Sequence, residues 1–237
     1  MEIQEHSVTT YRVWDPVVRW FHWINVLAVI ALSAFGTAIL FSKELGMTND
    51  GKVLLKVLHV SCGYVFAANL LLRVVWAFIG TPHARWRALL PSVRALGQGE
   101  WRERHQYIGH SPLARVSVTL MLAVLLAMAC TGLVLAGTDI YFPPLGPWIA
   151  EWVAAAGVAP ADVLPYRPDL VDAAAYREML AFRSPFVLVH EYGFYVLMVL
   201  VVGHIGGVAV SEIRNGGALV SAMFTGRKLL SKPPEDG

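Results

Sequence analysis

The sequence is poor in charge. Only 15% of its 237 residues are charged, against roughly 25% in an ordinary soluble domain, and 56% are apolar. This composition excludes a disordered chain and argues against a water-soluble globule. The formal net charge of +2 is too small to indicate a nucleic-acid partner.

Cysteine is also scarce. The two cysteines, Cys62 and Cys130, both lie in apolar stretches. The sequence has no C-x-x-C or C-x-x-C-H motif, so a zinc site, a redox dithiol and a covalently attached haem find no support.

Four apolar stretches are long enough to cross a membrane, whose hydrocarbon core of about 30 Å requires about 20 helical residues. The first contains 22 residues, 20–41, without Asp, Glu, Lys or Arg. It is longer than the roughly 7–15-residue apolar region of a secretory signal, so we expect it to remain in the protein. We therefore predict an all-α membrane protein, a single domain over 1–237, whose four transmembrane helices form a bundle at about 18–41, 55–79, 115–137 and 185–211.

Basic residues are divided unevenly between the two sides of such a bundle. The N-terminal segment, the 81–115 connection and the tail from 212 carry twelve Lys and Arg, whereas the 42–56 and 139–183 connections carry six. This asymmetry predicts that both termini are cytoplasmic. The long 139–183 connection between the third and fourth helices is then periplasmic. Its apolar start, rich in Trp and Pro, predicts a short helix in the membrane interface.

Ionisable side chains inside a span are costly and usually bind something. Four histidines lie in or beside the predicted spans. The fourteen residues between His190 and His204 correspond to about 21 Å along a helix and about 40° less than four turns, so both point to one face. Because the helices alternate in direction, we predict an outer pair, His59 with His190, and an inner pair, His22 with His204.

Small or cationic side chains recur at the depths of these pairs. Small residues leave room for a flat macrocycle between helices, and a guanidinium suits its propionates. The pattern predicts two haem b groups, each with one histidine above and one below the iron. The predicted haem-contacting positions are Arg73 at the inner depth and Gly36, Gly63 and Gly193 at the outer depth.

Other interpretations stay open at this point. Intramembrane histidines also pack and hydrogen-bond between helices, which would make the chain a redox-inactive membrane anchor. A metal-ion transporter needs three or four donors in one place, whereas each pair offers two histidines. Arg73 alone could snorkel to the interface, and the glycines alone could be close-packing positions.

The segment RHQYIGHSPLARVS, which includes His105, leads into the third span on the cytoplasmic side. Its polar backbone, broken by Gly and Pro, suits a quinone head group at Gly109, His110 and Ser111. The alternative is a helix cap, with Ser111 as the N-cap and Pro112 at the first helical position. The two roles are compatible.

Four features of the sequence match a known family. YRVWDPVVRWFHWINVLAV, YIGHSPLARVS, the H-x13-H of the fourth span and the GGALVSAMFTG that follows it resemble the b-type cytochrome subunits of membrane-bound nickel–iron hydrogenases. The di-haem gamma subunit of formate dehydrogenase is a more distant likeness. The resemblance covers about 11–230, and by position it gives the same two ligand pairs.

The resemblance implies a di-haem electron-transfer subunit of a respiratory chain in the bacterial inner membrane. Such a subunit joins a periplasmic redox partner to the quinone pool and would carry the quinone-reducing site. The 139–183 connection is longer than we expect in the hydrogenase subunits and lies on the side where the partner docks. The partner is therefore the hydrogenase small subunit or, alternatively, a periplasmic c-type cytochrome or another oxidoreductase.

Overall fold

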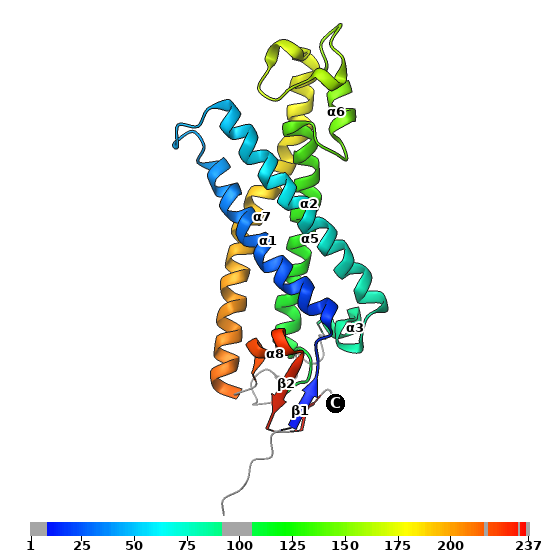
Figure 1. The fold of residues 1–237 in the computed structure, drawn as a ribbon, viewed down its shortest axis with the longest axis vertical. Coiled ribbons are helices and arrows are strands. Elements are labelled where there is room, and N and C mark those ends of the chain that lie inside the picture. The colour runs from blue at the N-terminus through cyan, green and yellow to red at the C-terminus, as the bar shows by residue number, and fades with distance from the viewer. Residues whose placement is uncertain (1–8, 92–105, 216–217, 232, 236–237) are drawn as a thin grey trace, which may run out of the picture. The chain divides into compact units, whose positions relative to one another are not determined.

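A computed structural model of the chain describes residues 9–91, 106–215, 218–231 and 233–235 (Figure 1). His6, His105 and the basic residues between 92 and 105 lie outside the described residues. In the described part of the chain, four helices are long and apolar enough to cross a membrane. They are α1 (Pro16–Leu40), α2 (Asn49–Ile79), α5 (Pro112–Ile140) and α7 (Ala173–Asn215).

These helices confirm the four predicted spans, and α7 extends well beyond its prediction. It begins at Ala173 instead of near residue 185, because Asp172 acts as its N-cap. Asp172 Oδ1 accepts hydrogen bonds from the backbone N–H groups of Ala174 and Ala175, at 3.0 and 2.8 Å, which satisfies two donors of the first turn. The last part of the predicted 139–183 connection, from Ala173 onward, is therefore helical.

The chain packs as two compact units, and each contains a part of all four long helices. His22 and His204 belong to unit 1, and His59 and His190 belong to unit 2. Each predicted ligand pair therefore falls within one unit. Unit 1 comprises residues 1–24, 70–123 and 197–237, and unit 2 comprises 25–69 and 124–196.

Unit 1 contains a two-stranded sheet that joins distant parts of the chain (Figure 1). β1 pairs antiparallel with β2, and Thr9 lies opposite Leu230. The short helix α8 leads into β2, and two short helical turns follow α2. The bounds are β1 (Thr9–Arg12), η1 (Pro82–Ala84), α3 (Trp86–Leu89), α8 (Leu219–Thr225) and β2 (Arg227–Leu230).

Asp15 fixes the start of α1 to the end of α2 within unit 1. Its Oδ1 accepts a hydrogen bond from Val18 N (2.9 Å), and its Oδ2 accepts from the Trp76 indole (3.0 Å) and the Thr81 hydroxyl (2.6 Å). Burial raises the pKa of Asp15, but these hydrogen bonds outweigh burial and hold the pKa below its ordinary value. The carboxylate is therefore charged at neutral pH and serves both helices.

Residues 141–172 of unit 2 form a lobe that packs on the first turns of α7. The lobe contains α6 (Gly146–Val153), which is the short helix predicted in this connection, and the turns η2 (Pro160–Asp162) and η3 (Pro168–Leu170). Its small apolar core includes a side chain from α7 itself. The buried residues of this core are Ile149, Ala150, Val153, Val163 and Met179.

Backbone hydrogen bonds close the lobe on itself. Ala155 N donates to Leu170 O at 3.1 Å, and Asp172 N donates to Val153 O at 2.8 Å. The chain between these residues therefore leaves and returns at almost the same place. The loops around α6 in Figure 1 are this closed segment.

Met179 tests whether α7 is part of the core of the lobe. It is 0% exposed, whereas the next residue, Leu180, is 39% exposed. We expect Met179→Ala to lower the free energy of unfolding of the lobe by about 2–5 kcal/mol, because the truncation leaves a cavity. Limited proteolysis in detergent should then cleave the lobe faster than in wild type. Leu180→Ala is the matched control, and equal cleavage rates in the two variants would contradict this packing.

Candidate functional site

The imidazole rings of His59 on α2 and His190 on α7 lie close together in unit 2. Their centroids are 6.2 Å apart and their planes are inclined at 75°. Two imidazoles that bind one metal ion from opposite sides, with nitrogen–metal distances of about 2 Å, have centroids about 6 Å apart. The separation of the rings therefore fits a haem iron with two histidine ligands.

Glycines from the other two long helices lie against these rings. A Cβ atom added at Gly36 of α1 would be 3.3 Å from His59 Cε1, and one added at Gly132 of α5 would be 3.3 Å from His190 Cε1. Both distances are tighter than an ordinary contact, so a larger side chain would displace the ring. Sequence reasoning selected Gly36 and missed Gly132, which has no histidine at a matching position on its own helix.

The other two predicted glycines have different surroundings. A Cβ atom at Gly63 would meet nothing within 4 Å, so this part of α2 is open. A Cβ atom at Gly193 would lie 2.7 Å from Met128 Sδ. Gly193 therefore accommodates a side chain from α5, which is the close-packing role considered for these glycines.

Thr131 of α5 orients the imidazole of His190. Its Oγ1 lies 2.9 Å from His190 Nδ1 and donates a hydrogen bond to Ala127 O at 2.7 Å. With its own proton engaged on that carbonyl, the hydroxyl accepts from His190 Nδ1–H and leaves Nε2 free to bind a metal. This is the arrangement by which outer groups orient metal ligands. Nothing in the sequence marks Thr131, because a threonine in an apolar span commonly bonds only its own helix.

His59 lacks such a partner. Its Nδ1 is buried and makes no hydrogen bond to the described residues, although the backbone of Leu32 on α1 lies near it. The two ligands of the outer pair are therefore held differently, one by a hydroxyl and the other by packing against Gly36.

A buried amide pair joins α1 and α2 in the same unit. Asn69 Nδ2 donates to Asn25 Oδ1 at 3.2 Å, and both residues are 8% exposed. Buried polar groups in an apolar environment need such partners. Sequence reasoning weighed only ionisable groups in the spans and missed this pair.

The inner pair, His22 on α1 and His204 on α7, lies in unit 1. His204 is close enough to act electrostatically on His22. The indole of Trp23 stands edge-on to the His22 ring, with centroids 5.2 Å apart. His22 and His204 therefore lie in the same region of unit 1.

Arg73 of α2 is buried in unit 1, with 5% of its surface exposed. Its Cζ lies 5.7 Å from the centroid of the Phe21 ring, and Asp15 acts on it electrostatically. The Nη1 atom is buried and has no hydrogen-bond partner. A buried guanidinium that is incompletely paired is costly, so the position suits an added carboxylate such as a haem propionate.

The segment before α5 encloses His110. Its ring packs on Trp14 with centroids 4.8 Å apart, Arg115 Nε donates to its carbonyl oxygen at 3.1 Å, and its Nδ1 is buried with no hydrogen-bond partner. Burial, and after it the positive charges of Lys228, Arg115 and Arg73, lower the pKa of His110 to about 3. The ring is therefore neutral at neutral pH.

The residues beside His110 start the helix. Ser111 Oγ accepts from Ala114 N at 3.4 Å, and Pro112 is the first residue of α5. This is the predicted capping arrangement. Gly109 is buried in the bend that precedes it.

Four apolar helices, with paired histidines and glycines against the rings, are the features of a membrane-embedded haem protein. The family model of the prokaryotic cytochrome b561 matches residues 13–226. The chain belongs to this family. A cytochrome of the b type binds haem b, and the chain is thus a multi-pass membrane haem protein that transfers electrons.

Individual relatives are similar over almost their whole length. A probable Ni/Fe-hydrogenase B-type cytochrome subunit of Rhizobium leguminosarum bv. viciae is 27% identical, over 99% of this chain and 93% of its own. A probable Ni/Fe-hydrogenase 1 B-type cytochrome subunit of Escherichia coli K12 is 23% identical, over 95% of this chain and 94% of its own. No solved structure was found to match at a significant level.

Thr131 offers a test of how His190 is held. We expect Thr131→Val to raise the midpoint potential of a haem bound by His190, because the imidazole loses a hydrogen-bond acceptor and becomes a less basic ligand. Redox titration of the purified protein, followed by its absorption, measures the shift.

Thr138→Val is the matched control, because Thr138 is also buried on α5 and bonds only Val134 O, at 3.1 Å. The control should leave the potential unchanged. Equal potentials in wild type and Thr131→Val would show that the hydroxyl does not orient the ligand.

Proposed function

We propose that the chain is a di-haem cytochrome b of the bacterial inner membrane, which passes electrons between a periplasmic redox protein and the quinone pool. The observation that carries this proposal is the 6.2 Å separation of the His59 and His190 rings, with a glycine of another helix against each ring. The grouping of His22 with His204 in unit 1 supports a second site of the same kind.

In this proposal His59 and His190 hold the outer haem and His22 and His204 hold the inner one. A haem iron held by two histidines would supply one-electron transfer. The protein then has to hold each macrocycle and keep water away from it. Gly36 and Gly132 leave space beside the outer ligands, and the buried Arg73 offers its guanidinium to a propionate of the inner haem.

The orientation follows from the charge asymmetry. In this orientation both termini lie in the cytoplasm, and the lobe of residues 141–172, which belongs to the same unit as His59 and His190, lies in the periplasm. The names of the relatives indicate the partner, because they describe cytochrome subunits of Ni/Fe hydrogenases. We infer that a hydrogenase docks on this periplasmic side and exchanges electrons with the outer haem.

The quinone is proposed to bind at Gly109, His110 and Ser111. The buried Nδ1 of His110 has no hydrogen-bond partner among the residues that the structure describes, and the neutral ring can pair with a quinone oxygen. The cations around His110, among them Arg115 and Lys228, favour negative charge on a reduced quinone.

Counting haems in ligand variants tests the two sites. We expect two b haems per chain in the wild-type protein by pyridine haemochrome assay. His59→Ala or His190→Ala should leave one haem and remove one spectral component, whereas His22→Ala or His204→Ala should remove the other. The control is His83→Ala, in η1 outside the long helices, which should keep both haems. A ligand variant that retains two haems with normal spectra would refute that ligand, and no haem in wild type would favour a redox-inactive anchor.

A second experiment tests the quinone site. We expect His110→Gln to slow quinol-linked reduction of the haems by at least about tenfold while the haem content stays at two, because the variant disturbs a group that contacts quinone and no iron ligand. Stopped-flow reduction with a soluble quinol measures the rate. The matched control is His83→Gln, in η1 outside the proposed site, which should leave the rate unchanged. If the reduction rate of His110→Gln equalled that of wild type, the segment would serve only as a helix cap and the quinone proposal would be wrong.

A further inference from the structure

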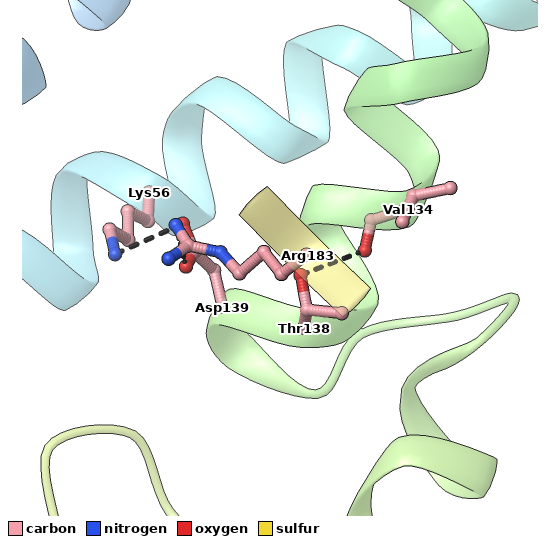
Figure 2. A network of polar contacts seen from close by, with 5 residues as sticks. All are labelled: Lys56, Val134, Thr138, Asp139 and Arg183. Atoms are coloured by element: carbon pink, nitrogen blue, oxygen red, sulfur yellow. Dashed lines mark hydrogen bonds and ion pairs between the residues drawn. The ribbon is translucent and has the colours of Figure 1, made fainter. Parts of the chain in front are cut away.

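Three charged side chains from three long helices meet in unit 2 (Figure 2). Lys56 Nζ of α2 lies 3.1 Å from Asp139 Oδ2 of α5, and Arg183 of α7 forms an ion pair with Asp139 Oδ1. The side chains of Lys56, Asp139 and Arg183 are 15, 22 and 25% exposed. Most of this charged cluster is therefore shielded from solvent.

The cluster has one more cation than it has acids. Asp139 is the single carboxylate that pairs with Lys56 or Arg183 in the described part of the chain. Arg183 Nε is buried and has no hydrogen-bond partner among the described residues, while Lys56 Nζ also lies 5.1 Å from the centroid of the Tyr166 ring. A shielded excess of positive charge with a free donor is costly unless an anion completes it.

The three residues stand in register with the outer haem ligands. Lys56 precedes His59 by three residues, which is about one turn and 4.5 Å along α2. Arg183 precedes His190 by seven residues and Asp139 follows Gly132 by seven, and each step is about two turns and 10.5 Å. Seven residues return nearly to the same helix face, so the charges lie on the faces that carry the ligands.

We propose that Lys56 and Arg183 bind the propionate carboxylates of the outer haem, and that Asp139 holds the two cations in place. The proposal rests on the proposed function, because it requires a haem between His59 and His190. An arginine that already gives part of its guanidinium to Asp139 still has a donor for a second carboxylate. Charge-assisted hydrogen bonds of this kind are strong where water is scarce.

Shielding favours this ligand over a protein partner. Charges that steer a docking protein act from the exposed rim of an interface, whereas these three side chains are at least three-quarters covered. The unit would then hold the outer haem by iron ligation at one end and by ion pairing at the other.

The test is the midpoint potential of the outer haem, which is identified as the component lost in His190→Ala. Removing a nearby cation favours the oxidised, more positive iron. We expect Lys56→Gln and Arg183→Gln each to lower the ratio of reduced to oxidised outer haem about tenfold at a fixed potential. For one electron, this corresponds to a midpoint potential that is lower by about 59 mV. Asp139→Asn should raise the potential.

Matched controls come from the same helices. Lys52→Gln on α2 and Arg177→Gln on α7 remove equal charges outside the cluster and should leave the potential of the outer haem within a twofold change in that ratio. The inner haem serves as an internal control in every variant. Shifts of equal size in the cluster variants and the controls would overturn the proposal.

A chemical variant of the haem keeps the test decisive if a substituted protein fails to fold. Wild-type apoprotein is loaded with haem b or with its dimethyl ester, which lacks the propionate charges. We expect the ester to be lost from the outer site at least tenfold faster in detergent, and the effect of Lys56→Gln on the potential to disappear with the ester. If the outer site of the wild-type protein retained haem b and its dimethyl ester equally well, the proposal would be overturned, whatever the variants do.

These results separate the two proposals. Two haems per chain with an unchanged outer potential in both cluster variants would overturn the propionate assignment alone. A wild-type protein without a haem at His59 and His190 would overturn both proposals.

Discussion

The separation between His59 and His190 constrains the whole of unit 2. Two imidazoles that bind one metal ion from opposite sides require the helices that carry them, α2 and α7, to hold the rings about 6 Å apart, and the observed distance is 6.2 Å. Helices packed through large side chains would leave no room for a macrocycle in that gap. Gly36 and Gly132 remove this obstacle, because α1 and α5 present backbone to the rings instead of side chains.

Two polar contacts near this centre are made within the protein, as an apolar surrounding favours. Thr131 accepts a hydrogen bond from His190 and donates one to the carbonyl of Ala127, and Asn69 donates one to Asn25. The atoms left without a partner are equally informative. In the described part of the chain they are Arg19 Nε, His59 Nδ1, Arg73 Nη1, Trp86 Nε1, His110 Nδ1 and Arg183 Nε, and four of these six belong to residues for which a haem or quinone contact is proposed.

The sequence was sufficient for the number of spans, because each of the four stretches is long and mostly apolar enough to cross a bilayer. It also selected the histidines, since helix packing alone rarely places four of them at paired depths. It could not predict that α7 begins at Ala173, because the capping bonds of Asp172 depend on a local turn and the helix that follows has an ordinary amphipathic composition up to residue 184. The role of Asp139 was also hidden, since the sequence places it in a connection and only the fold brings it to Lys56 and Arg183.

Thr131 and Gly132 show a further limit of sequence reasoning. Neither residue is ionisable, and in a span both are ordinary, so only their position against His190 reveals what they do. By contrast, Gly36 was found because its spacing from His22 matches the spacing of the histidines on α7. Spacing along one helix can be read from the sequence, whereas adjacency between helices requires the fold.

Because the two ends of the lobe are bonded to each other, the loop between them and the helix α7 can change independently. Ala155 and Leu170 are bonded to each other, and Asp172 is bonded back to Val153, so the loop between them can be lengthened or replaced without altering the register of α7. The helix that carries His190 is thereby insulated from variation on the exposed side. A change in the length of this loop would therefore leave the helix that carries His190 in place.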